Sequence, residues 1–129
     1  MCYYLFEVVR LISNGIDLVE INRFKSISKN NKFLNDNFND IELYYLKKCD
    51  YSLASIAGIY AAKEAFLKAI KKGISDYSLK DIIVSHNMNG APYFIFQGKI
   101  KEDYNCSNIS LSISHDGDYA IASVFIYFS

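Results

Sequence analysis

The sequence predicts an α+β domain, because its helical segments precede most of its strands instead of alternating with them. The strongest helical signal covers about residues 51–72, a run with many alanines that ends before Gly73. The strongest strand signal is a pair of apolar runs, residues 82–84 and 92–96, joined through the Asn89-Gly90 step of a tight turn. The 129 residues are 51% hydrophobic, which suffices for a single domain with its own core.

The other elements follow from local patterns in chain order. Before the long helix, apolar spacing and cap residues predict a strand over about residues 6–17, a helix over about 21–28, a helix end and loop over about 26–39, and a helix over about 41–49 capped by Asn39 or Asp40. The long helix has Asp50 or Ser52 as its expected cap. After the hairpin, the patterns predict a short amphipathic piece over about 99–104 and two strands over about 109–114 and 119–128.

Charge and cysteine content narrow the functional class. Fourteen basic and fourteen acidic residues cancel, so no overall field attracts this single domain (residues 1–129) to nucleic acid or membrane. Three scattered cysteines indicate reduced thiols, and therefore a cytoplasmic protein, or one of a plastid-type organelle such as an apicoplast if the gene encodes a leader. Residues 1–12 are too short to span a bilayer, and we expect a trimmed leader or an extended first strand there.

The long helix carries a carboxylate and an ammonium among small residues. Glu64 and Lys68 lie four residues apart, so their side chains leave the helix about 40° apart and can act on one ligand. Taken alone, such a pair is most often a surface ion pair that adds about 0.3 to 0.5 kcal/mol to helix stability. Asp17 follows Gly15 at the expected end of the first strand, where a carboxylate suits a hard cation such as Mg²⁺. The alternative for Asp17 is a cap of the next helix.

A histidine stands near the last turn of the chain. His115 follows Ser112 and Ser114 at the end of a predicted strand, where its imidazole can contact a phosphate. A serine one or two positions away on the same strand is poorly placed for proton transfer, and no nucleophile elbow is present, so a catalytic triad is rejected. His86 is expected to be a surface residue at a strand end.

Three ordered blocks resemble the acyl-carrier-protein synthase group of 4'-phosphopantetheinyl transferases. They are Gly15-Ile16-Asp17 with Arg23 six residues later, Ala61 to Ala69 with the sequence AAKEAFLKA, and Leu111 to His115 followed by Tyr119-Ala120. The segment Asn89-Gly90-Ala91-Pro92-Tyr93 resembles a further turn of the family. Together the blocks span the chain from Gly15 to its last strand.

The resemblance implies the 4'-phosphopantetheinyl transferase fold, a small antiparallel sheet packed on a long helix, and a homotrimer with active sites at the subunit interfaces. The implied reaction transfers 4'-phosphopantetheine from coenzyme A to a serine of apo acyl carrier protein, in fatty acid biosynthesis, and releases adenosine 3',5'-bisphosphate. The implied cofactor is Mg²⁺, with Mn²⁺ as an alternative metal, and coenzyme A is the substrate. Whether Glu64 or a water molecule takes the serine proton stays open.

The resemblance also assigns residues. Asp17 and Glu64 are the implied metal ligands, and with Lys68 they form the implied catalytic set. The implied coenzyme-binding residues are Lys63, Asn89, Gly90, Pro92, Ser114 and His115. The acidic carrier protein is expected to dock on a basic helix face made of Arg23, Lys25, Lys29 and Lys32.

Three positions depart from the family pattern. Ile59, Ala91 and Ser13 stand where the family has an arginine, a lysine and a glycine, so altered coenzyme affinity is expected. The alternative function is a non-catalytic module that binds coenzyme A or a carrier protein without transfer. The intact set of Asp17, Glu64 and Lys68 argues against that alternative.

Overall fold

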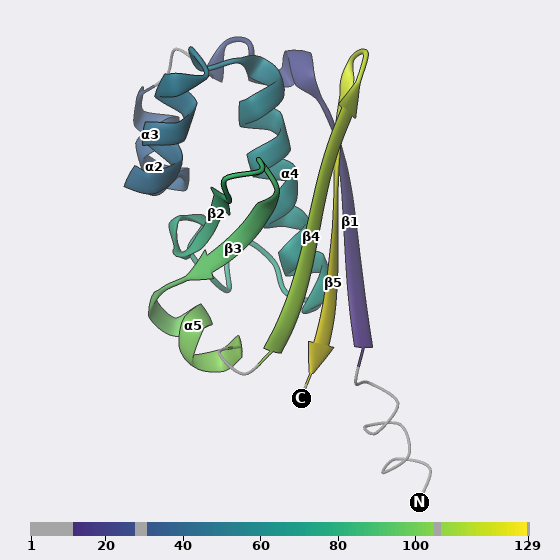
Figure 1. Cartoon of the computed structure of the whole chain (residues 1–129). Coiled ribbons are helices and arrows are strands. Elements are labelled where there is room, and N and C mark those ends of the chain that lie inside the picture. The colour runs from purple at the N-terminus through teal and green to yellow at the C-terminus, as the bar shows by residue number, and fades with distance from the viewer. Residues whose placement is uncertain (1–11, 28–30, 105–106, 129) are drawn as a thin grey trace, which may run out of the picture.

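Helices gather in the first half of the chain and strands in the second, after one N-terminal strand (Figure 1). The computed structural model describes residues 12–27, 31–104 and 107–128. In chain order its elements are β1 (Ile12–Glu20), the 3₁₀ turn η1 (Ile21–Phe24), α2 (Asn31–Asn37), α3 (Asp40–Lys48), α4 (Leu53–Ala69), the 3₁₀ turn η3 (Leu79–Asp81), β2 (Ile82–His86), β3 (Pro92–Phe96), α5 (Gly98–Tyr104), β4 (Ser107–Asp116) and β5 (Tyr119–Phe128). This order confirms the α+β class.

The strands form two antiparallel sheets. In the larger one, β5 is central and pairs with β1 on one side and β4 on the other, while β2 and β3 form a separate hairpin. Figure 1 shows α4 along one face of the three-stranded sheet, with α2 and α3 on the far side of α4. The predicted β2–β3 hairpin is therefore confirmed, and the long helix is the layer between the sheet and the other helices.

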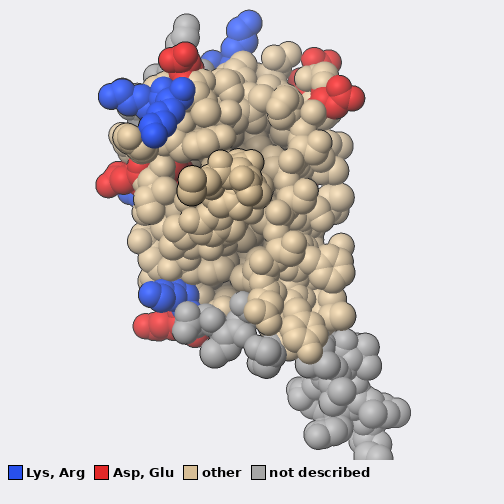
Figure 2. Space-filling model, in the orientation of Figure 1, with Lys and Arg blue, Asp and Glu red and all other residues tan. Residues whose placement is uncertain are grey.

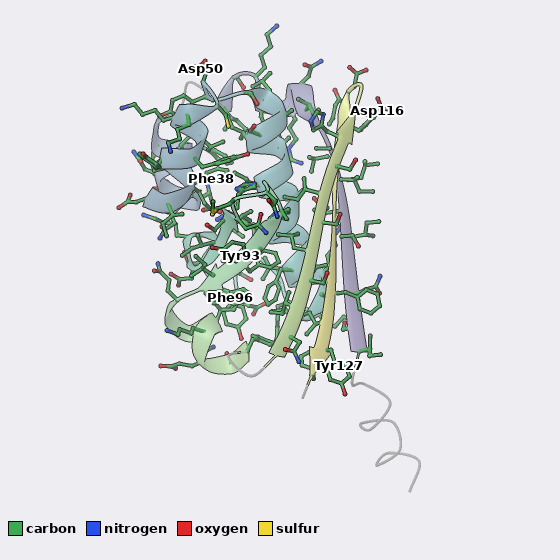
Figure 3. The ribbon with its side chains drawn as sticks, viewed as in Figure 1. Phe38, Asp50, Tyr93, Phe96, Asp116 and Tyr127 are labelled. Carbon is green, nitrogen blue, oxygen red and sulfur yellow. The ribbon has the colours of Figure 1, made fainter. Side chains whose placement is uncertain are left out.

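The core lies where α4 meets the sheet. Every second residue of β5 from Ala120 to Ile126 is buried, and the same alternation on β1 buries Gly15, Asp17 and Val19. On the other side of α4, Phe38 is fully buried, and Figure 3 shows it between α4 and the helices α2 and α3. Apolar burial of this kind is the main stabilising contribution in a domain of this size.

Gly15 permits the closest approach between β1 and α4. A Cβ at this position would lie 2.0 Å from the carbonyl oxygen of Ala65 and 2.6 Å from the backbone nitrogen of Ala69. Both neighbours are backbone atoms of a helix and cannot move aside singly. We expect Gly15→Ala to lower the free energy of unfolding by about 3 kcal/mol, measured by urea denaturation.

Gly58 offers a matched control for that prediction. A Cβ there would meet only Cγ2 of Ile113, a side-chain atom, at 3.0 Å. Alanine is also more favourable than glycine in a helix interior, by about 1 kcal/mol. This gain offsets the contact, so Gly58→Ala should change the free energy of unfolding little. Equal losses in the two variants would contradict the close approach at Gly15.

The first strand and the helix after it differ from expectation. β1 continues to Glu20, because its pairing with β5 extends to the contact of Glu20 with Tyr119. Asp17 therefore lies within the strand and is not a helix cap. The helix expected over residues 21–28 is a single 3₁₀ turn, held to the sheet by a hydrogen bond from Ile21 N to Asp118 O, and residue 28 falls outside the described residues.

Two further helix predictions need correction. Part of the expected loop forms α2, because Leu34 is buried and Phe33 contacts the ring of Phe38 despite the polar sequence between them. The long helix ends at Ala69, before the expected Gly73. Lys71 takes a positive φ of 62° there, and the bonds from Lys71 N to Lys68 O and Lys72 N to Leu67 O close the helix in a Schellman motif.

The caps were predicted more accurately. Asn39 caps α3 through a reciprocal capping box with Glu42, and the Ser52 hydroxyl accepts a hydrogen bond from the backbone nitrogen of Ser55 at the start of α4. Within the described part of the chain, no helix is long and apolar enough to cross a membrane.

Candidate active site

Asp17 meets Lys68 where β1 crosses α4. Asp17 faces the helix and is 9% exposed, and its Oδ1 accepts a hydrogen bond of 2.8 Å from Nζ of Lys68. The Lys68 side chain is 56% exposed, so its ammonium borders solvent while it pairs with a nearly buried carboxylate. Lys68 thus pairs with Asp17, and the two residues join elements far apart in the sequence.

Glu64 lies one helical turn before Lys68, and Tyr60 one turn before Glu64. Burial raises the pKa of Tyr60, and the neighbouring Glu64 carboxylate raises it further, whereas the Arg23 guanidinium opposes this effect. Arg23 lies 5.5 Å from the centre of the Tyr60 ring. Asp17 also raises the pKa of Tyr60 by its charge, so these groups share one electrostatic environment.

The residues at this site fit a hard divalent cation. Oδ2 of Asp17 is buried and has no hydrogen-bond partner among the described residues. Burial of a carboxylate oxygen without a partner costs free energy, which a bound cation would offset. Mg²⁺ typically takes one or two protein carboxylates and leaves its other positions to water and substrate oxygens. No group of three or more His, Cys, Asp or Glu suited to a metal occurs in the described parts of the chain.

Lys63 does not reach this site. The expectation that it contacts a phosphate is not met, because its side chain is completely buried on the other side of α4. Its Nζ donates to Oε1 of Glu42 at 2.7 Å and to the carbonyl oxygens of Leu79 and Ile82 at 2.7 and 2.9 Å. Burial lowers the pKa of Lys63 and raises that of Glu42, and each charged partner opposes the other's shift. Lys63 is a structural residue.

A second group of predicted residues surrounds a pocket of about 200 Å³ on another side of α4. Its lining includes Gly90 and Pro92 of the β2–β3 turn and His115 of β4. The other lining residues are Tyr45, Ala54, Ser55, Gly58, Ile59, His86 and Ile113. Ile59, which replaces the family's arginine, is therefore part of the wall.

Asn89 and Ser114 do not line this pocket. Asn89 is exposed in the turn, where its backbone nitrogen donates to Oδ1 of Asn87. Ser114 precedes His115 on β4, and successive residues of a strand face opposite sides of the sheet. Within one subunit, Ser114 and His115 therefore face different surroundings.

The two groups do not meet in one subunit. Asp17 and His115 stand on the outer strands β1 and β4, with β5 and the overlying α4 between them. Gly58 of the pocket and Glu64 are six residues apart on α4, which places them about 120° apart around the helix. The metal-suited pair and the pocket consequently face different sides of the molecule.

The basic residues expected to dock a carrier protein are only partly described. Arg23 packs against the rings of Phe24 and Tyr60 at 5.5 Å from each centre, and Lys25 is exposed. Lys32 pairs with Asp36 at 2.7 Å on the surface of α2, and Lys29 lies outside the described residues.

The similarity of the chain to known proteins shows its superfamily. A statistical profile of the 4'-phosphopantetheinyl transferase superfamily matches residues 13–124, which include both groups of site residues. The chain belongs to the 4'-phosphopantetheinyl transferase superfamily. The family resemblance of the sequence is thereby confirmed.

Individual members of this superfamily are similar over nearly the whole chain. A holo-[acyl-carrier-protein] synthase of Caldicellulosiruptor saccharolyticus is 40% identical over 111 residues, which cover 84% of this chain and 89% of the relative. The structure of the Helicobacter pylori holo-[acyl-carrier-protein] synthase in complex with coenzyme A is 35% identical, with a TM-score of 0.78, and covers 88% of this chain and 98% of that one. An ACPS–CoA complex of Chronobacterium ammoniagenes has a TM-score of 0.80 at 26% identity over 92% of this chain and 98% of that one.

The sequence motifs did not point to Tyr45 or Tyr60 in this phosphopantetheinyl transferase, and His86, which was expected on the surface at a strand end, does end β2 but is partly buried. Tyr60 belongs to the Asp17 group, and its spacing of one turn before Glu64 was a usable signal. Tyr45 and His86 belong to the pocket, where their rings stack. No sequence pattern links two residues that are 41 positions apart, one on a helix and the other on a strand, so only the three-dimensional structure reveals this contact.

Proposed function

We propose that this chain is a holo-[acyl-carrier-protein] synthase, which transfers 4'-phosphopantetheine from coenzyme A to a serine of apo acyl carrier protein and releases adenosine 3',5'-bisphosphate. The family membership supports the reaction class. The observation that carries the proposal within the site is the Asp17 carboxylate, which has one oxygen on Lys68 and the other buried without a partner among the described residues.

In this reaction the serine oxygen forms a bond to the β-phosphorus of coenzyme A, and the bond from that phosphorus to the oxygen of adenosine 3',5'-bisphosphate breaks. Asp17 and Glu64 are the residues that would hold Mg²⁺, which when bound supplies positive charge to the pyrophosphate. Lys68, whose exposed ammonium is held by Asp17, would neutralise developing charge on the leaving phosphate. Glu64 is the candidate acceptor of the serine proton.

The acidic carrier protein is proposed to dock beside the Asp17 group, on Arg23, Lys25, Lys29 and Lys32. Arg23 supports this placement because it lies on η1, directly after β1, and its guanidinium packs against Tyr60 next to Glu64. Charge complementarity of this kind chiefly accelerates association and fixes orientation. We place the reaction, which belongs to fatty acid biosynthesis, in the cytoplasm or a plastid-type organelle.

The outer face of the three-stranded sheet supports assembly as a homotrimer. This face, directed away from α4, exposes large apolar side chains: Ile12, Ile16 and Leu18 of β1, and Tyr119, Phe125 and Tyr127 of β5. Figure 2 shows that the margin of the molecule along these strands carries charged groups only near its upper end. An exposed apolar patch of this kind marks a surface for protein contact. The family resemblance implies that the active sites of such a trimer lie at its subunit interfaces, and we propose that the pocket and the Asp17 group come from neighbouring subunits.

A charge on that face is expected to prevent assembly. Ile16 lies in the middle of β1 and is 54% exposed, so Ile16→Glu should leave the subunit folded while it places a carboxylate in the proposed interface. We expect the trimer to become a monomer by light scattering and transfer activity to be lost with it. Ile74→Glu is the control, since Ile74 is equally exposed at 59% but lies outside the sheet. A trimeric Ile16→Glu variant would contradict the interface.

Release of adenosine 3',5'-bisphosphate distinguishes the proposed function from its rivals. A transferase releases this nucleotide from coenzyme A only when apo carrier protein and a divalent metal are both present. A non-catalytic module, the alternative function, would bind coenzyme A and release none. Release without a carrier protein would indicate a hydrolase. Chromatography of the reaction mixture, with each component omitted in turn, separates the three.

A further inference from the structure

The pocket at the β2–β3 turn contains a histidine to which the proposed reaction gives no role. His86 is the last residue of β2 and pairs in register with Pro92, the first residue of β3. It lines the pocket together with Gly90, Pro92 and His115. It therefore stands among the residues assigned to the coenzyme, on the opposite strand of the same hairpin.

The His86 ring is held by Tyr45 of α3. The two ring centres are 4.0 Å apart and their planes are inclined by 11°, a stacked arrangement. Nδ1 of His86 is buried and has no hydrogen-bond partner within the described structure. The stack fixes the ring plane, and the burial of Nδ1 leaves Nε2 as the nitrogen available to a ligand.

The burial of Nδ1 also determines where the ring proton lies. A neutral imidazole has one N–H donor and one acceptor nitrogen, and a buried donor without a partner is rarer in proteins than a buried acceptor without one. The favoured tautomer therefore carries its proton on Nε2. Burial lowers the pKa of His86, so that the ring is neutral near pH 7.

The backbone beneath the stack is fixed by Glu42. Oε2 of Glu42 accepts a hydrogen bond of 2.8 Å from the backbone nitrogen of Val84, and both groups are buried. Glu42 lies three residues before Tyr45 on α3, and Val84 lies two residues before His86 on β2. The same helix and strand are thus joined twice, and the Nε2–H of His86 is presented from a rigid wall.

The chemistry of the wall favours an uncharged part of a ligand. Among the described residues that line the pocket, none is Lys, Arg, Asp or Glu. Its volume of about 200 Å³ is below the range of about 300 to 1,000 Å³ typical for a whole small-molecule ligand. We propose that His86 is a specificity-determining residue whose Nε2–H donates a hydrogen bond to the adenosine of coenzyme A. This inference rests on the proposed function.

Two substitutions separate a donor from a packing role. His86→Phe keeps a ring to stack on Tyr45 but removes the N–H, whereas His86→Gln keeps an N–H near the position of Nε2 but removes the ring. We expect His86→Phe to weaken coenzyme A binding about fivefold and His86→Gln to retain most of the affinity. A purely structural His86 predicts the reverse order.

Isothermal titration of the full-length protein with coenzyme A, and separately with 3'-dephospho-coenzyme A, measures these affinities. His86→Phe should lose the same factor in affinity for both ligands, because the proposed contact is to adenosine and not to the 3'-phosphate. Met88→Ala, at a fully exposed position of the same turn, should bind as the wild type does. Thermal unfolding of each variant checks that it is folded.

Each outcome decides the proposal. A loss confined to coenzyme A would place His86 at the 3'-phosphate and overturn the contact with adenosine. Unchanged binding by His86→Phe, in a protein whose wild type transfers phosphopantetheine, would overturn the role of His86 alone. A wild type that binds no coenzyme A would overturn the proposed function as well.

Discussion

Glu64→Gln is expected to lower kcat/KM for phosphopantetheine transfer by a factor of about 10³. Glutamine has nearly the shape of glutamate, but its neutral amide oxygen binds a divalent cation weakly and cannot accept the serine proton. Glu64 is only partly buried, so the variant should fold normally. Steady-state kinetics with apo carrier protein, coenzyme A and Mg²⁺ measure the effect.

Glu102→Gln is the matched control for the loss of one carboxylate. Glu102 lies on α5, is exposed, and belongs neither to the proposed site nor to the proposed docking surface. Its replacement should leave kcat/KM unchanged. Asp17→Asn should lower kcat/KM by as much as Glu64→Gln does. The double variant should lose little more activity, because the two carboxylates act as a unit. Transfer by Glu64→Gln within about threefold of the wild type would contradict the assignment.

Lys63→Met is expected to lower the free energy of unfolding by about 3 to 5 kcal/mol, because it leaves the Glu42 carboxylate buried without its charged partner. The carbonyl oxygens of Leu79 and Ile82 lose their donor at the same time. Such a loss is a large part of the stability of a domain of this size. Urea denaturation followed by circular dichroism measures it.

The ion pair on α2 provides a control with the same distance between its charged atoms. Lys32 and Asp36 are also 2.7 Å apart, but their side chains are 83% and 56% exposed, so water screens the pair. Lys32→Met should therefore leave stability unchanged within error. If Lys63→Met kept full stability but lost coenzyme affinity, Lys63 would be a phosphate ligand after all and its structural assignment would be wrong.

The sequence predicted those parts of the fold that local patterns specify. Alanine-rich helical spacing predicted α4, the Asn89-Gly90 step predicted the β2–β3 hairpin, and Asn39 and Ser52 were among the expected caps. The Asn-rich α2 was missed because its stability comes from burial of Leu34 and the contacts of Phe33, which local propensity does not reveal. The extent of β1 was missed because β5, a distant strand, determines it.

The sequence likewise predicted only part of the candidate site. The family motifs predicted Asp17, Glu64 and Lys68 as site residues, which stays a prediction, and the structure shows Asp17 bonded to Lys68 where β1 crosses α4. The same motif suggested a ligand role for Lys63, because a pattern of charged residues on a helix does not show which side is buried. The pairing of Lys63 with Glu42 depends on the packing of α3 and β2 on α4.

The transfer itself is tested most directly by intact-mass spectrometry of an apo acyl carrier protein incubated with this chain, coenzyme A and Mg²⁺. We expect the carrier to gain the mass of one phosphopantetheine, and we expect a chelator, Glu64→Gln or replacement of the acceptor serine with alanine to abolish this gain. An unchanged carrier mass, in a mixture where the chain binds coenzyme A and a known synthase modifies the same carrier, would contradict it.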